Sequence, residues 1–217
     1  MDLTEFSPAS ALVTVILIAL APFVAVMVTS FTKIVVTLSL LRNALGLQQT
    51  PPNIVINGLS LILTIYVMYP VFTEMAAIAG PQIEQATDDT AGMFAVINSA
   101  KEPLRDFLLQ HSDETQRQFF LSTIERVIDD PTQVPAADDF VVIVPAFTVS
   151  ELAKAFQIGF LIFLPFLIID LVVANILLAM GMMMLSPTIV SLPFKLLLFV
   201  IVDGWVKLAH GLVLSYT

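Results

Sequence analysis

Long apolar segments alternate with polar ones along this chain, and the apolar segments are almost free of charge. Residues 7–32 carry no charged side chain, and residues 54–72 form a second uncharged segment. Each is close to the roughly 20 apolar residues that a helix needs to span a bilayer. We therefore predict two membrane-length helices in the first third of the chain, the first kinked at Pro22.

The segment between these two predicted helices carries only two charges, Lys33 and Arg42. It ends at Thr50-Pro51-Pro52, where the double proline prevents a helix from continuing. Because short cytoplasmic loops are enriched in Lys and Arg, we expect this connector on the cytoplasmic side. The next polar segment would then lie outside the cytoplasm.

The polar segment between Glu74 and Glu151 holds 14 of the 18 acidic residues. Within it, Asp113 has the position of a helix N-cap, whereas Phe140 to Val144 has the pattern of a short β-like run. Thr148 to Glu151 has the spacing of a capping box and predicts the start of the next helix. Two interpretations of the polar region stay open, a solvated connector domain and a surface for contact with another subunit.

The last third of the chain is the most apolar part. From Ala155 to Val202 it carries two charges, Asp170 and Lys195. If this stretch folds into a helical hairpin that turns between Gly181 and Pro187, the two opposite charges lie at similar depth on facing arms. The hairpin tip then carries four of the nine methionines, in the run Met180-Gly181-Met182-Met183-Met184. Such a hairpin is typical of part of a pore or a gate.

Each candidate functional feature of this hairpin has two interpretations. Asp170 and Lys195 form either a fixed ion pair that sets the hairpin register or a proton relay through Asp170. We favour the fixed pair, because Asn175 is the only other strongly polar side chain on that arm. The methionines form either an apolar turn packed in a core or a flexible seal, since Met conforms to irregular partners. Beyond the hairpin, Asp203 and Lys207 have the i, i+4 spacing of a helical ion pair.

Composition narrows the class of protein. Hydrophobic residues make up 58% of the 217 residues, charged residues 12%, and the mean hydropathy is +0.93, values typical of a membrane protein or of an apolar assembly. The net charge of −9 argues against nucleic acid as a partner. The chain has no cysteine, no phosphate-binding loop pattern, no nucleophile elbow, and no metal-ligand spacing around His111 or His210. We therefore expect no catalytic residues, no metal site and no cofactor.

Several motifs in the same order resemble the FliP/SctR family of type III secretion and flagellar export proteins. They cover most of the chain outside residues 74–144. The early motif is Leu41-Arg42-Asn43-Ala44-Leu45-Gly46 with Gln48-Gln49 and Pro51-Pro52. The central motif is Pro145-Ala146-Phe147-Thr148-Val149-Ser150-Glu151-Leu152 with Ala155-Phe156-Gln157-Ile158-Gly159-Phe160. The late motif comprises Pro165-Phe166, Ile169-Asp170, the methionine run, Ser186-Pro187, Ser191-Leu192-Pro193-Phe194-Lys195 and Asp203-Gly204-Trp205.

The resemblance implies an export-gate subunit that forms a pentameric ring with SctS-type and SctT-type membrane proteins. Much of that ring would lie on the periplasmic side of the bacterial inner membrane, and unfolded secreted proteins would be its cargo. The family's methionine gasket maps onto Met182, Met183 and Met184, and its intramolecular ion pair maps onto Asp170 and Lys195. The short chain, without a convincing leader peptide, favours the injectisome branch over the flagellar one.

We therefore expect an all-α protein of membrane-associated helical hairpins that assemble into a ring. Residues 1–73 would form an N-terminal apolar hairpin, residues 74–148 a polar extracytoplasmic region, and residues 149–217 a C-terminal helical hairpin with the Met-rich tip. Its expected function is a gated protein-export pore without catalysis. Two alternatives stay open, a small-solute or proton transporter that uses Asp170 and a structural scaffold without a pore.

Overall fold

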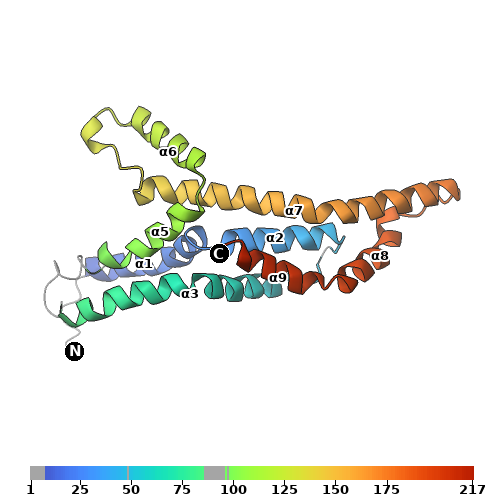
Figure 1. The fold of residues 1–217 in the computed structure, drawn as a ribbon, viewed down its shortest axis with the longest axis horizontal. Helices are drawn as coiled ribbons and strands as arrows, with labels where there is room; N and C mark the ends of the chain where they lie inside the picture. Colours follow the sequence, from blue (N-terminus) through green and yellow to red (C-terminus); the bar gives the residue numbers. More distant parts are fainter. Residues whose placement is uncertain (1–7, 48, 86–95, 97) are drawn as a thin grey trace.

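The structure is a computed structural model that describes residues 8–47, 49–85, 96 and 98–217. Gln48 of the early motif and residues 86–95 and 97 of the polar segment lie outside the described residues. Every element in the described part is helical, and no strand occurs there, which confirms the all-α prediction. The elements are α1 (Pro8–Met27), α2 (Phe31–Ala44), α3 (Asn53–Gln85), α5 (Glu102–His111), α6 (Glu114–Val127), the short 3-10 helix η2 (Pro131–Gln133), α7 (Phe140–Ala179), α8 (Pro187–Ile201) and α9 (Gly204–Leu214) (Figure 1).

Helix α2 lies at the centre of the molecule, between α7 on one side and α3 and α9 on the other (Figure 1). Its buried side chains recur at helical spacing, so that one broad face packs against its neighbours. Ile34 and Leu38 pack with Ile56 of α3 and Leu212 of α9. Toward the end of α2, a second buried cluster joins it to α7 and α8 through Leu41, Ala44, Leu45, Phe166 and Phe199. A third cluster joins α3, α5 and α7 through Met68, Val71, Phe107, Leu108, Ile143 and Phe147.

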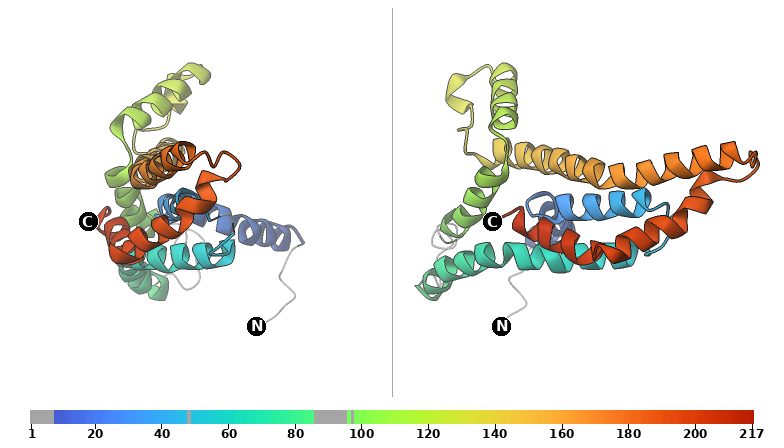
Figure 2. Two further views of the ribbon diagram at one scale, coloured as in Figure 1. Left: turned by 90° about the vertical axis from the view of Figure 1, so that its right-hand side faces the viewer. Right: turned by 45° about the vertical axis from the view of Figure 1, so that its right-hand side comes forward.

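The two ends of α7 extend away from this central body in different ways. At one end, α7 and α8 form a hairpin whose tip projects beyond all other helices (Figures 1 and 2). At the other end, α6 stands off from the body, although it contacts the start of α7 (Figure 1). Asp113 caps α6 as predicted, since its carboxylate accepts a hydrogen bond from the Thr115 backbone N–H at 2.8 Å.

The first apolar segment breaks at a different place from the one predicted. Pro22 lies inside α1, and the chain instead bends by 68° between Met27 and Phe31. Lys33 is on α2 and is 1% exposed. The prediction that Lys33 and Arg42 lie in a connector is therefore wrong, because both residues belong to α2. The side of the membrane on which they lie stays a prediction. The sequence pattern did not predict that Lys33 is buried. Helix α2 has enough apolar side chains at its other positions to pack in the core with this one charge among them.

The predicted β-like run is also wrong, because Phe140 to Val144 forms the first turn and a half of α7. The side chains of Val142, Ile143, Ala146 and Phe147 are all fully buried, at a spacing that places them on one face of a helix. Burial of this face against α3 and α5 outweighs the β preference of the valines. As a result, the predicted capping box at Thr148 to Glu151 lies inside α7 and starts no helix.

Two helices are long and apolar enough to cross a membrane, α7 and the residues 53–82 of α3. The number rises to four in the described part if each bent pair, α1 with α2 and α8 with α9, counts as one span. Helix α7 has 40 residues, so it is about 60 Å long, whereas the hydrocarbon core of a bilayer is about 30 Å thick. Part of this apolar helix must therefore be covered by something other than lipid tails.

The contact between α2 and α7 depends on a glycine. A Cβ atom on Gly159 would lie 2.3 Å from Leu40 Cδ1 and 3.0 Å from Leu40 Cβ. We predict that Gly159→Ala lowers the free energy of unfolding by about 1–3 kcal/mol, because Leu40 must leave its rotamer and its Cβ must move away slightly in a packed interface. Thermal unfolding in detergent, followed by far-UV circular dichroism, measures the effect.

The matched control is Gly211→Ala in α9, where an added Cβ meets no atom within 4 Å. This variant should be neutral or more stable by up to about 1 kcal/mol, since Ala favours a helix more than Gly does. Equal losses of stability in both variants would contradict the close-approach explanation.

Candidate functional site

The turn of the α7–α8 hairpin is specified by its own sequence. Gly181, with φ of 73°, ends α7 in the left-handed conformation that glycine adopts without strain. The Met182 N–H then bonds to the Leu177 carbonyl at 2.9 Å, and the Gly181 N–H bonds to the Leu178 carbonyl at 3.1 Å. Pro187 occupies the first turn of α8, where its missing N–H costs nothing. The predicted turn between Gly181 and Pro187 is therefore where the structure has it.

Asp170 and Lys195 meet across the hairpin. Lys195 Nζ lies 2.6 Å from Asp170 Oδ2, and the Ser191 hydroxyl donates a hydrogen bond to Asp170 Oδ1. Lys195 Nζ also donates to the Ala44 carbonyl at 3.3 Å, at the C-terminal end of α2. This end of a helix attracts a cation, because its last carbonyl groups are unpaired and partly negative. Lys195 thus links α7, α8 and α2 at one point.

This geometry favours a fixed ion pair over a proton relay. Lys195 is 2% exposed, and both carboxylate oxygens of Asp170 already have a donor. Protonating Asp170, as a relay requires, would leave the Lys195 ammonium group buried without a counter-charge, which is strongly unfavourable. The Ser191 contact was missed at the sequence level, although its spacing of four residues from Lys195 places both side chains on the same face of α8.

The methionine tip is exposed rather than packed in the core of the chain. Met183 is 79% exposed and Met184 is 100% exposed, whereas Met182 is 42% exposed and partly covers the space between the helices. Below the tip, an open apolar cavity of about 490 Å³ lies between α7 and α8. Its lining includes Ile169, Val173, Met182 and Phe194. In a single copy, the interpretation of this turn as an ordinary core turn is therefore wrong.

Asp203 and Lys207 do not form the predicted helical ion pair. Among the described residues no contact within ion-pair distance joins them, although both are described. Asp203 has φ of 52° and ψ of 46° and is the N-cap residue at the break between α8 and α9. Since Asp203 is not in helical conformation, its side chain does not follow the i, i+4 geometry that such a pair requires.

A second group of charges, buried except for the 41% exposed side chain of Lys154, was not predicted. Glu151, fully buried on α7, is 3.4 Å from Lys33 Nζ on α2 and 3.2 Å from Lys154 Nζ, one turn along α7. The Tyr216 hydroxyl donates a hydrogen bond to Glu151 Oε2, and the Lys33 ammonium lies 3.4 Å from the centre of the Tyr216 ring. Lys154 Nζ also donates to the His111 carbonyl at 2.6 Å. We call these residues, Lys33, Glu151, Lys154 and Tyr216, the Glu151 cluster.

One signal in the sequence pointed to the Glu151 cluster. Lys33 is a lone charge in an apolar stretch, as Asp170 and Lys195 are, and such a charge requires a partner. The partner could not be identified, because Glu151 lies 118 positions away at the edge of an acidic region. Burial raises the pKa of the Tyr216 phenol, which therefore remains a protonated donor.

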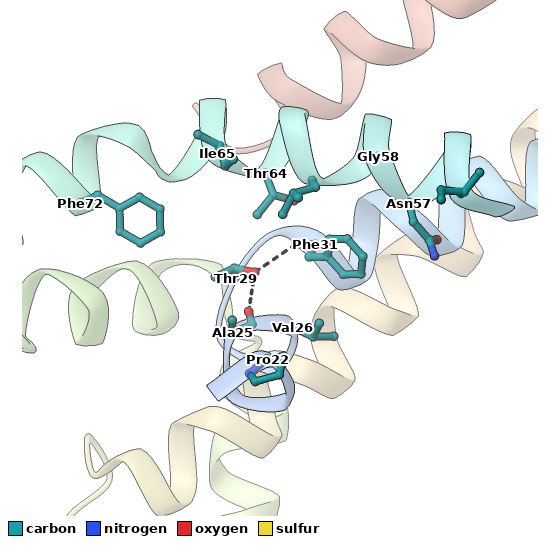
Figure 3. Close-up of a pocket in the computed structure, with 12 residues that line it drawn as sticks. Pro22, Ala25, Val26, Thr29, Phe31, Asn57, Gly58, Thr64, Ile65 and Phe72 are labelled. Atoms are coloured by element: carbon teal, nitrogen blue, oxygen red, sulfur yellow. Dashed lines mark hydrogen bonds between the residues drawn. The ribbon is translucent and has the colours of Figure 1, made fainter. Parts of the chain in front are cut away.

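An apolar groove of about 500 Å³ lies where the bend between α1 and α2 faces α3 (Figure 3). Pro22, Ala25 and Val26 line it from α1, and Ile65 and Phe72 line it from α3 (Figure 3). The Thr29 hydroxyl in its wall donates to the Ala25 carbonyl at 2.6 Å, so it is not free for a ligand. The groove is lined mostly by apolar side chains, and no titratable group is among its lining residues.

These features define a class, that of helical membrane proteins with an apolar hairpin, buried ion pairs and no assembled catalytic group in the described residues. The sequence pattern of the FliP family matches residues 13–212, so the chain belongs to the FliP family. Members of this family are components of the type III protein-export apparatus.

Three relatives show the range of the similarity. The hypersensitivity response secretion protein HrcR of Ralstonia nicotianae is 46% identical over 218 residues, which cover 100% of both chains. The Yop proteins translocation protein R of Yersinia pestis is 48% identical over 204 residues and 92% of each chain. The flagellar biosynthetic protein FliP of Pectobacterium carotovorum is 48% identical over 196 residues, which are 90% of this chain but 73% of the relative. The expected membership is confirmed, and the two secretion relatives match this chain in length better than the flagellar one.

Breaking the hairpin ion pair should destabilise the protein. We predict that Asp170→Asn lowers the free energy of unfolding by about 3 kcal/mol, because Lys195 is left buried without a counter-charge. The matched control is Asp203→Asn, which should change it by less than about 0.5 kcal/mol, since Asp203 has no ion-pair partner among the described residues and Asn tolerates the left-handed conformation. Unfolding in detergent measures both variants. A small effect of Asp170→Asn would show that the pair contributes little.

His111 should make stability depend on pH. Burial lowers the pKa of His111 below its usual 6.5, so the unfolded chain binds a proton more readily than the folded chain. Its contribution to stability is therefore complete above pH 6.5 and is lost as the pH falls toward the folded pKa. We predict that His111→Gln reduces the loss of thermal stability between pH 7.5 and 5.5. Equal losses in the variant and the parent chain would contradict this.

Proposed function

We propose that this chain is an export-gate subunit of a type III secretion system, and that the tips of its α7–α8 hairpins close the protein-conducting channel. The observation that carries the proposal is the exposed methionine tip, held at a defined position by a buried ion pair. Membership in the FliP family supports the export role, as do relatives named for secretion and translocation.

Met182, Met183 and Met184 would form the seal. Methionine side chains are flexible and polarizable, so a ring of them can close on itself and can also conform to varied polypeptide segments. The ion pair between Asp170 and Lys195 would hold the two arms in register, so that the tips meet at the same height. Ser191 and the Ala44 carbonyl would complete this anchor. We propose no catalytic step and no cofactor for this chain.

The chain would work as an oligomer, a pentamer by family resemblance, together with SctS-type and SctT-type subunits. The support from the structure is the apolar surface that a single copy leaves uncovered. Most described side chains of α1 are exposed, and α7 exposes large apolar residues along much of its length. Monomeric soluble proteins rarely expose large apolar residues along whole helices, as this chain does on α1 and α7. Neighbouring subunits and lipid would cover them, with the assembly in the bacterial inner membrane and largely on its periplasmic side.

Three regions of the chain would divide this work. Residues 1–73 would contribute an apolar hairpin, residues 74–148 an extracytoplasmic region, and residues 149–217 the hairpin that forms the gate. The helix α7 crosses the last boundary, so the extracytoplasmic region and the gate would be mechanically continuous. Unfolded secreted proteins would pass through the channel as cargo.

The transporter alternative receives less support from the same site. A proton or solute transporter would need Asp170 to face water and to exchange protons. The Asp170 side chain is 23% exposed, but both of its carboxylate oxygens already accept hydrogen bonds, from Lys195 and Ser191, and Lys195 is almost completely buried. A structural scaffold without a pore would leave the exposed methionines unexplained.

Replacing the methionines should open the seal. We predict that the triple variant Met182→Ala, Met183→Ala, Met184→Ala increases ion conductance through the assembled complex in lipid bilayers, because three small side chains cannot fill the constriction. The control is Met27→Ala, an exposed methionine of α1 that should leave conductance unchanged. Unchanged conductance in a correctly assembled triple variant would contradict the gasket.

A further inference from the structure

The Glu151 cluster joins three parts of the chain that are far apart in sequence. Glu151 receives Lys33 from α2, Lys154 from its own helix and the Tyr216 hydroxyl from the C-terminal segment. The cluster lies near the start of α7, and the hairpin tip lies at the other end of the same helix (Figure 1). Its contacts are therefore separate from those of the proposed gate.

Tyr216 has two roles in this cluster. Its hydroxyl donates to Glu151, and its ring lies 3.4 Å from the Lys33 ammonium, which is within range of a strong cation–π contact. The cluster holds two cations and one carboxylate. The Tyr216 hydroxyl bonds to the carboxylate and the Tyr216 ring faces the Lys33 ammonium, so both parts of this side chain contribute to balancing the charge. Glu151 and Lys33 have exposed fractions of 0% and 1%, and water cannot replace the tyrosine unless the structure opens.

Tyr216 also forms part of the surface on which α5 lies. Its ring stacks on Phe107 with centroids 5.9 Å apart, and it meets His111 edge-on at 5.0 Å. The last turn of α5 is further held by Lys154, which donates to the His111 carbonyl. The C-terminal segment and the end of α5 thus share one set of contacts.

The α5–α6 arm, residues 102–127, contacts the body through this surface and through Phe107 and Leu108, which are buried in the cluster shared with α3 and α7. Only Ser112 and Asp113 separate α5 from α6, and α6 has no buried side chain of its own. The Asp113 N–H donates to the Ser150 hydroxyl at 2.9 Å, one residue before Glu151 on α7. Apart from contacts with the start of α7, α6 stands away from the body (Figure 1). The direction of α6 is therefore set by the end of α5 together with the contacts of α6 with the start of α7.

We propose that Tyr216 is a latch that holds the α5–α6 arm against α7, and that the arm and the C-terminal segment are released together when the latch opens. Opening exposes Glu151 and Lys33 to water, which lowers the cost of separating their charges. The latch requires no ligand and does not rest on the proposed gate. It makes Tyr216 and the segment that follows α9 part of what positions the α5–α6 arm.

Hydrogen–deuterium exchange of the full chain in detergent tests the latch. Tyr216→Ala should raise exchange roughly tenfold or more in α5 and in the last turns of α9 together, because a buried carboxylate loses its donor and α5 loses its ring contacts. Tyr216→Phe keeps the ring and should produce a smaller increase in the same two segments. Exchange in α8, next to the Asp170 ion pair, should stay unchanged in both variants.

The matched control is Tyr69→Phe, which removes a hydroxyl from a tyrosine that is 65% exposed and should leave exchange unchanged. If Tyr216→Ala fails to fold by circular dichroism, Tyr216→Phe decides, since it retains the ring and all apolar contacts. Faster exchange in α9 without a change in α5 would overturn the proposal, because Tyr216 would then anchor only its own segment. Unchanged exchange in both segments would overturn it as well.

Discussion

The contact between α2 and α7 is the constraint on which the other features depend, and it is fixed at three places. Lys33 at the start of α2 pairs with Glu151, and Gly159 permits close approach in the middle. At the end of α2, Lys195 of α8 bonds both to the Ala44 carbonyl and to Asp170 of α7, and so links the two helices indirectly. Buried ion pairs add little net stability, because removing charges from water is costly. They do make a shifted register expensive, since any slip leaves a buried charge without its partner. Charges at both ends therefore determine which turn of α7 faces which turn of α2.

This arrangement explains how an almost entirely apolar chain reaches one structure. Apolar side chains of similar size can pack in several registers with similar energy, as tolerant repacking of hydrophobic cores shows. The long helix α7 is apolar on most sides, so hydrophobic contact alone would not fix its position. The few polar contacts supply that selection, and the apolar surface left over is available for lipid and for other subunits.

The geometry of the hairpin connects this anchoring to the proposed gate. Lys195 links α8 to both α7 and α2, so the projecting tip is held by the body of the molecule and not only by its own turn. The turn itself is compact because Gly181 adopts a left-handed conformation. Between these two fixed features the methionines remain exposed. A hairpin that is anchored in the body of the molecule and carries adaptable methionine side chains at its tip is suited to closing a channel that must also open for polypeptides of varied sequence.

The sequence by itself determined the all-α class, the hairpin turn, the pairing of Asp170 with Lys195 and the family. These features follow from local rules, namely helical periodicity, the glycine and proline at the turn, and the need of a lone charge for a partner. Only the tertiary structure decided that Lys33 is buried against Glu151 and Tyr216, that Phe140 to Val144 is helical, and that Asp203 forms no ion pair with Lys207. In each of these cases the outcome depends on what packs against the segment, and those partners are distant in the sequence.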